Sequence, residues 1–166
     1  MSGYSQPRPI QASDDHASFD CGEPSLNEYL HKRAYNNDRR GASRCYVTLR
    51  GGRVVGYYAL AMTSIQHASA PGRVRRNMPD PIPAILLTRL ATDLAERGQG
   101  LGSNLLRDAI TKAVEASRII GARCLLVHAT SPNAAAFYAH FNFVESPTDP
   151  LHLLVSMKDA EALVDG

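Results

Sequence analysis

Apolar residues recur at helical spacing in three segments of the chain, which we predict as helices. These segments are Ser25 to about Asn37, Leu101 to about Ser117, and about Asn133 to His140. Pro24 near the start of the first segment is typical of a helix N-terminus. Ser131-Pro132 offers an N-cap and a first-turn proline to the third.

Runs rich in β-branched, aromatic and aliphatic residues predict five strands. They are Cys45–Leu49, Val54–Met62, Ile85–Leu94, Cys124–Ala129 and Leu151–Met157. The Arg-Gly-Gly-Arg sequence at residues 50–53 predicts a hairpin between the first two strands. Residues 63–83 hold four prolines and predict a long loop of the kind that is often functional. The order of elements predicts an α/β fold with a mixed sheet.

The length of 166 residues is most naturally one domain, spanning residues 1–166. A hydrophobic share of 44% and a charged share of 20% are typical of a soluble globular protein. The N-terminus lacks the apolar core of a signal peptide and no stretch approaches a membrane span, so we expect a cytoplasmic protein without membrane contact. Three cysteines without a C-x-x-C and scattered histidines predict neither a disulfide framework nor a metal site.

The net charge is only +2, but the charges are segregated along the chain. Residues 29–45 carry five Lys and Arg residues against Asp38 alone, and residues 68–79 add three arginines without an acid. By contrast, the stretch from Glu145 onward carries five acids and only Lys158. This segregation is equally compatible with a polyanionic partner on one face and with an ordinary solvated surface.

The hexapeptide Arg97-Gly98-Gln99-Gly100-Leu101-Gly102 stands between a predicted strand and a predicted helix. Glycines let a backbone approach a ligand closely, and the first turn of a helix presents unpaired N–H groups that favour an anion such as pyrophosphate. A Walker A loop is excluded because no Lys-Ser/Thr pair follows the last glycine. A Rossmann fingerprint is excluded because the spacing is G-x-G-x-G and no acid stands about twenty positions on.

The pattern R-x-x-G-x-G, formed by Arg97, Gly100 and Gly102, resembles the acyl-CoA pyrophosphate loop of GNAT-family N-acetyltransferases. A second segment, Ser131–Phe143, resembles the family's short helix ending in F-Y-x-x-x-G-F. Asn142 stands where the family has glycine, and asparagine also tolerates the left-handed conformation that this helix end demands. The order of elements from about Phe19 to Met157 is the one expected of the GNAT fold.

The GNAT resemblance implies acetyl-CoA as the acyl donor and assigns roles to particular residues. Tyr138 is expected beside the thioester sulfur as the general acid, with a packing tyrosine as the alternative. A backbone N–H of the 90–92 strand is expected to polarise the acetyl carbonyl. The residues expected to contact the donor are Leu90, Ala91, Thr92, Arg97, Gly98, Gln99, Gly100, Leu101, Gly102, Ser103, Asn133 and Phe137.

No carboxylate presents itself as a general base: Glu96 adjoins the glycine loop and Asp93 ends a strand. A lysine amine, with a pKa near ~10.4, needs strong help to lose its proton, whereas an α-amine near ~7.7–8.0 is already substantially neutral. The missing base therefore favours an α-amine acceptor, although a water relay to a more distant base stays open.

The N-terminal half resembles the toxin branch of the GNAT family. The matching segments are Phe19–Gly22, Leu26–Leu30, Ala34–Asn37, Gly41–Arg44, Val54–Leu60 and Leu87–Ala91. Those toxins acetylate the α-amine of the amino acid on charged tRNA and so stop translation. The resemblance therefore implies an aminoacyl-tRNA substrate, a ribbon-helix-helix antitoxin as partner, and a homodimer.

A tRNA substrate needs basic side chains to contact phosphates. The candidates are Lys32, Arg33, Arg40, Arg44, Arg73, Arg75, Arg76 and Arg89. Arg89 has a second interpretation as a structural ion pair. Two other functions stay open: a GNAT enzyme acting on a protein N-terminus or a small amine, and an acyl-CoA-binding regulator or DNA-binding partner without turnover.

Overall fold

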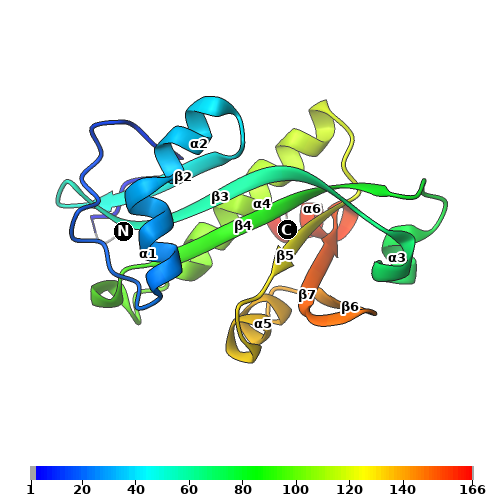
Figure 1. Ribbon diagram of the computed structural model, residues 1–166. Coiled ribbons are helices and arrows are strands. Elements are labelled where there is room, and N and C mark those ends of the chain that lie inside the picture. The colour runs from blue at the N-terminus through cyan, green and yellow to red at the C-terminus, as the bar shows by residue number, and fades with distance from the viewer. Residues whose placement is uncertain (1–2, 166) are drawn as a thin grey trace. The chain divides into compact units, whose positions relative to one another are not determined.

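The computed structural model describes residues 3–165, which divide into two compact units. One unit comprises the described residues up to Ala61 together with Arg89–Ala109, and the other comprises Met62–Thr88 and the described residues from Ile110 onward. The described strands form a seven-stranded mixed sheet in the order β1-β2-β3-β4-β5-β7-β6 (Figure 1). In chain order they are β1 (Arg8–Pro9), β2 (Arg44–Arg50), β3 (Arg53–Ile65), β4 (Ile82–Thr92), β5 (Cys124–His128), β6 (Val144–Ser146) and β7 (Asp149–Ser156).

The first unit contains the hairpin that the sequence predicted. Strand β1 (Arg8–Pro9) pairs antiparallel with β2 (Arg44–Arg50), and β2 pairs antiparallel with β3 (Arg53–Ile65). The turn between β2 and β3 consists of Gly51 and Gly52, both with positive φ. The two-residue strand β1 was not predicted, because its sequence has neither length nor alternation.

Two helices, α1 (Pro24–Lys32) and α2 (Ala34–Arg40), replace the single helix expected over residues 25–37. Arg33 between them has φ −126° and ψ −32°, which ends α1. Tyr29, Leu30 and Ala34 are all buried in one core, so the apolar periodicity continues across the break and did not reveal it. Gly41, in the left-handed conformation, then closes α2 by donating its N–H to Asn37 and Asp38 carbonyls.

The core of the first unit lies between these helices and the hairpin. Its buried members are Ile10, Phe19, Tyr29, Leu30, Ala34, Cys45, Val47, Val54, Tyr57, Ala59 and Ala91. Helix α4 (Leu101–Ile119) begins in this unit and packs against β3 at Gly56. A Cβ at Gly56 would lie 2.8 Å from Leu105 Cδ1, so the absence of a side chain there permits this close packing.

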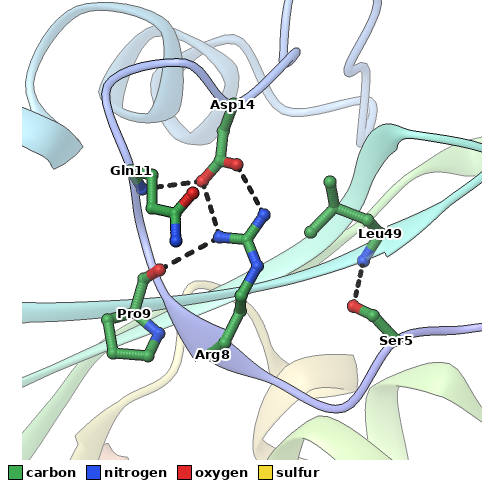
Figure 2. A network of polar contacts seen from close by, with 6 residues as sticks. All are labelled: Ser5, Arg8, Pro9, Gln11, Asp14 and Leu49. Atoms are coloured by element: carbon green, nitrogen blue, oxygen red, sulfur yellow. Dashed lines mark hydrogen bonds and ion pairs between the residues drawn. The ribbon is translucent and has the colours of Figure 1, made fainter.

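The N-terminal segment is attached to the hairpin by polar contacts (Figure 2). Arg8 binds the carboxylate of Asp14 with both terminal nitrogens, at 3.1 and 2.7 Å. The same carboxylate accepts the Gln11 backbone N–H at 2.7 Å. Ser5 Oγ accepts the Leu49 N–H at 2.9 Å. These contacts fix residues 5–14 beside β2 although only two of them form a strand.

The second unit contains most of the remaining strands. Within it β4 (Ile82–Thr92) runs parallel to β5 (Cys124–His128). Strand β7 (Asp149–Ser156) is antiparallel to both β5 and β6 (Val144–Ser146). The buried core of this unit comprises Ile65, Ala70, Val74, Ile82, Ala84, Cys124, Leu126 and Leu154.

Helices of the second unit are α3 (Gly72–Arg75), α5 (Pro132–Ala139) and α6 (Met157–Asp165). The predicted loop over residues 63–83 is shorter than expected: β3 continues to Ile65, and the short η1 (His67–Ser69) and α3 lie within the loop. Helix α6 and strand β6 were not predicted. No described helix is long and apolar enough to span a bilayer.

The strand expected at Ile85–Leu94 starts earlier, at Ile82, and ends at Thr92. The residues after it form η2 (Leu94–Glu96), a single 3₁₀ turn. The Asp93 side chain caps this turn by accepting the Ala95 N–H at 2.9 Å, which is the local reason why the strand stops there.

Candidate acetyl-transfer site

The glycine loop comes directly before α4, as the sequence predicted, but the turn η2 separates it from the preceding strand. Gly98 and Gly100 have φ of 78° and 76°, a region that L side chains rarely adopt. A Cβ at either position would have no heavy atom within 4 Å, so the need for glycine is one of backbone conformation. The Asn104 N–H donates to the Gly100 carbonyl at 3.1 Å and so opens the helix directly after the loop.

The loop is accessible to a ligand, and its chemistry suits an anion. Residues 97–100 are exposed, whereas Leu101 is 4% exposed and anchors the start of α4. The Arg97 side chain has no ion-pair or hydrogen-bond partner among residues 3–165. A free guanidinium, left-handed glycines and the N-terminus of a 19-residue helix provide N–H donors and positive charge for a phosphate group.

The strand residues expected to face the acyl group have different environments. Ala91 is 5% exposed and joins the core of the first unit, while Leu90 and Thr92 are half-buried. The Ala91 side chain therefore serves packing, and the contribution expected of this segment is through its backbone.

Neither acid near the loop is available as a base. The Asp93 carboxylate accepts the backbone N–H groups of Asp20 and Ala95, at 3.2 and 2.9 Å. The Glu96 carboxylate accepts the Tyr4 hydroxyl and an Arg50 nitrogen. The hydrogen bond from Tyr4, assisted by Arg50, lowers the pKa of Glu96. Both acids are thus occupied by structural partners.

Tyr138 lies in the second unit, in the last turn of α5. The helix begins as predicted: Ser131 Oγ accepts the Ala134 N–H at 3.1 Å, and Pro132 follows. The helix is followed by Asn142 with φ 69°, which confirms that asparagine takes the left-handed position where the family has glycine. Of the two donor-contact candidates on α5, Asn133 is exposed and Phe137 is half-buried.

The Tyr138 ring is buried and its hydroxyl is free of internal partners. The ring is 7% exposed and packs against Phe137 and Phe143, with centroids 5.2 and 5.7 Å away. No described residue forms a hydrogen bond with the hydroxyl. Burial raises the pKa of Tyr138 to about 12, so the phenol is protonated at neutral pH. A protonated phenol without an internal acceptor is able to donate to a ligand.

The basic candidates of the first unit differ in how they are engaged. The side chains of Arg33 and Arg40 are exposed and have no ion-pair or hydrogen-bond partner among the described residues, whereas Lys32 forms an i,i+4 pair with Glu28 at 3.6 Å. Arg44 donates to the Asp38 carbonyl at 2.6 Å. Arg89 lies over the Tyr29 ring, with 3.8 Å between its guanidinium carbon and the ring centroid. Its structural partner is therefore an aromatic ring, and the ion pair that the sequence left open as its alternative role is not found among the described residues.

The three candidate arginines of the second unit also differ. Arg73 forms a two-pronged pair with Asp159, at 2.8 and 2.6 Å. Arg75 donates to the Ala70 carbonyl at 2.9 Å. The Arg76 side chain is exposed and has no ion-pair or hydrogen-bond partner within residues 3–165. Arg76 is thus more readily available to a polyanion than Arg73.

Sequence reasoning missed Tyr4 and Arg50, which hold the segment preceding the glycine loop. Their contacts with Glu96 bridge 92 and 46 positions of sequence. The N-terminal segment carries no periodic pattern, so no sequence signal pointed to Tyr4.

Comparison with known proteins agrees with this geometry. The model of the acetyltransferase (GNAT) domain matches residues 41–145. The chain belongs to the GNAT family and is an acetyl-CoA-dependent N-acetyltransferase. It is 63% identical to the tRNA-acetylating toxin of Mycobacterium tuberculosis over 99% of both chains. It is also 27% identical to the probable toxin TacT of Sinorhizobium fredii, over 90% of this chain and 89% of that one.

Solved structures of toxins are similar along almost the whole chain. AtaT complexed with acetyl-methionyl-tRNAfMet has a TM-score of 0.87 at 28% identity, covering 96% of this chain and 98% of that one. A tyrosine-to-phenylalanine mutant of AtaT, bound to acetyl-CoA and the C-terminus of the antitoxin AtaR, has a TM-score of 0.84 at 26% identity, covering 99% of both.

Proposed function

We propose that this chain is a toxin that moves the acetyl group of acetyl-CoA to the α-amine of an aminoacyl-tRNA and so blocks translation. The observation that carries the proposal is the 63% identity, over 99% of both chains, to a tRNA-acetylating toxin. The similarity to AtaT, solved with acetyl-methionyl-tRNAfMet, supports the same substrate class. The whole chain is proposed to work as one acetyltransferase domain.

The chemistry assigned to this chain has four parts. Residues 97–103 bind the donor's pyrophosphate, and a backbone N–H of residues 90–92 polarises the acetyl carbonyl. Asn133 and Phe137 are further proposed donor contacts. The amine nitrogen attacks the carbonyl carbon, the C–S bond breaks, and the amine's surplus proton leaves to water. Tyr138 donates a hydrogen bond, and then its proton, to the departing thiolate, and the tyrosinate regains a proton from water, which balances the one that the amine released.

Protonation states are compatible with this sequence of events. The pKa of Tyr138, about 12, keeps the proton donor loaded at neutral pH. The α-amine of an aminoacyl ester, with a pKa near or below ~7.7–8.0, needs no strong base. Solved structures of both AtaT and KacT carry a tyrosine-to-phenylalanine mutation, which is the change that a mechanism with a tyrosine acid invites.

For tRNA binding we propose the exposed basic residues, led by those without internal partners. Arg33 and Arg40 in the first unit and Arg76 in the second meet this condition. To bind a phosphate, Lys32, Arg44 and Arg75 would have to break only a weak ion pair or a hydrogen bond to a backbone carbonyl. Arg89 is proposed at the acceptor end, held in place by Tyr29.

The proposal includes partners and location. A cognate antitoxin of the ribbon-helix-helix type is proposed to neutralise the toxin, supported by the solved complex of AtaT with the C-terminus of AtaR. We further propose a homodimer, and the cytoplasm as the place of action because charged tRNA is found there.

The test is acetyl transfer from labelled acetyl-CoA to total tRNA, either charged or stripped of amino acids. We expect label in the charged pool alone, released by mild alkaline deacylation, and labelling that is roughly 10²–10⁴-fold slower with the Tyr138→Phe variant. Label in neither pool, together with acetylation of peptide N-termini or polyamines, would favour the alternative GNAT function. Acetyl-CoA binding without turnover on any amine would instead indicate a regulator.

A further inference from the structure

The segment that leads into the glycine loop is built around two buried acids. Asp93 and Glu96 are 8% and 6% exposed, and they flank the single turn η2. A buried carboxylate is tolerated only when hydrogen bonds and opposite charge replace its lost water. The partners of these two acids therefore determine where the segment, and the loop directly after it, can lie.

The partners of Glu96 are Tyr4 and Arg50. The Tyr4 hydroxyl and Arg50 Nη1 both donate to Glu96 Oε1, the latter at 2.8 Å. Tyr4 and Arg50 also contact each other, because their backbones form an isolated antiparallel bridge and the Arg50 guanidinium lies 5.5 Å from the Tyr4 ring centroid. The three side chains thus form one closed cluster in which each touches the other two.

Asp93, at the other end of the turn, is held by Asp20. The Asp20 N–H donates to Asp93 Oδ2 at 3.2 Å, and the Leu94 N–H donates to the Asp20 carbonyl at 2.9 Å. Tyr4 and Asp20 are the two ends of one stretch, residues 4–20, which we call the N-terminal strap. The strap therefore forms hydrogen bonds at both ends of η2.

The strap is itself fixed to the hairpin between its two ends. The Ser5 N–H donates to the Leu49 carbonyl at 2.8 Å, and the Val54 N–H donates to the Asp15 carbonyl at 2.8 Å. The Arg8–Asp14 pair closes the turn of the strap (Figure 2). The strap thus provides a rigid support on which η2 rests.

We propose that Tyr4 and Arg50, acting through Glu96, are positioning residues for the pyrophosphate-binding loop. The inference rests on the proposed role of residues 97–102 in holding the donor's pyrophosphate. Gly98 and Gly100 allow the left-handed backbone of this loop, but glycine also gives the loop more conformational freedom. The ends of the loop must therefore be fixed by other residues. Leu101 fixes the end at α4, and Glu96 fixes the end at η2. A loop fixed in its binding conformation loses less entropy when the anion binds.

Two donors that differ in the pyrophosphate separate positioning from general stability. Acetyl-CoA carries the pyrophosphate, and S-acetylpantetheine lacks it together with the 3′-phosphoadenosine attached to it. For Tyr4→Phe and Arg50→Gln we expect roughly tenfold weaker binding of acetyl-CoA, since a lost hydrogen bond to a charged group has about this effect. Binding of S-acetylpantetheine, measured by the same calorimetry, stays unchanged. In turnover, KM for acetyl-CoA rises while kcat stays within about twofold.

The matched control is Arg8→Gln, which weakens the strap without touching Glu96, Tyr4 or Arg50. We expect a lower melting temperature but an unchanged affinity for acetyl-CoA. Equal weakening of acetyl-CoA binding in Arg8→Gln and Tyr4→Phe would overturn the proposal, because it would reflect strap stability alone. Equal loss of both donors in Tyr4→Phe would do the same. If the unmodified protein binds both donors with equal affinity, the proposed role of residues 97–102 in pyrophosphate binding is itself wrong.

Discussion

Replacing Tyr138 with phenylalanine is the sharpest test of the proposed chemistry, because the structure separates its effect on catalysis from its effect on stability. No described residue accepts a hydrogen bond from the Tyr138 hydroxyl, so its removal orphans no protein group. We therefore expect a change in unfolding free energy within about 0.5 kcal/mol. Loss of the general acid should lower kcat by roughly 10²–10⁴-fold, which is ~2.7–5.4 kcal/mol in activation free energy.

Tyr57→Phe is the matched control with the opposite signature. The Tyr57 hydroxyl donates to the Leu26 carbonyl at 2.8 Å within the first core. Losing this hydrogen bond should cost about 0.5–1.5 kcal/mol of stability and lower the melting temperature by a few degrees, while kcat stays unchanged.

The assay measures the release of free CoA thiol with charged tRNA as the acceptor, over roughly pH 6–9. Tyr138 stays protonated throughout this range because its pKa is so high. Because burial raises the pKa of Tyr138 to about 12, the unmodified protein should show no loss of kcat from its ionisation in this range. Turnover by Tyr138→Phe within about threefold of the unmodified enzyme would refute the assignment, since a general acid contributes at least ~10²-fold.

Three further outcomes follow from particular contacts. Gly56→Ala should destabilise the protein by about 1–3 kcal/mol in thermal unfolding, because the new Cβ would lie 2.8 Å from Leu105 Cδ1. Gly121→Ala is the control: its Cβ would have no atom within 4 Å, so its effect on the same thermal unfolding should be near zero. Burial raises the pKa of Cys45 and Cys124 to about 12, so a thiol reagent near neutral pH should label only the half-buried Cys21 in the native protein and all three thiols after denaturation. Arg76→Ala should weaken charged-tRNA binding and reduce its salt dependence by about one ion. Arg73→Ala should weaken tRNA binding less, because the Arg73 side chain is paired with Asp159. Equal effects of the two substitutions would contradict the ranking of the arginines by their internal partners.

The parts of the site that could be predicted from sequence are those whose constraint is local. Left-handed glycines ahead of a helix, and an asparagine in the same conformation after α5, are requirements of single backbone positions. The Ser131 cap acts over three residues. Such constraints leave a fixed pattern in the chain, which is why the glycine loop, α4 and α5 were found within a residue or two of their predicted bounds.

Features set by distant contacts could not be predicted in this way. The break at Arg33 leaves the apolar periodicity intact, because Leu30 and Ala34 on either side of it remain buried in the same core. The Tyr4–Glu96 contact joins residues 92 positions apart, and neither residue belongs to a motif. Which arginines are free is likewise a tertiary property: Arg73 and Arg76 look alike in sequence, and only the fold places Asp159 beside the first.

The partners of the acidic side chains bear on the choice of acceptor. A general base works best when its pKa lies near the working pH. Hydrogen bonds and nearby cations instead lower the pKa of Asp14, Asp20, Glu96 and Asp159, through contacts that hold the fold together. These four acids are therefore held in structural contacts and are not tuned to act as a base. An amine that is already neutral at physiological pH needs no strong base, a condition that the α-amine of an aminoacyl ester meets and the side-chain amine of lysine does not. The contacts of these four acids are thus compatible with the acceptor that the similarity to a tRNA-acetylating toxin supports.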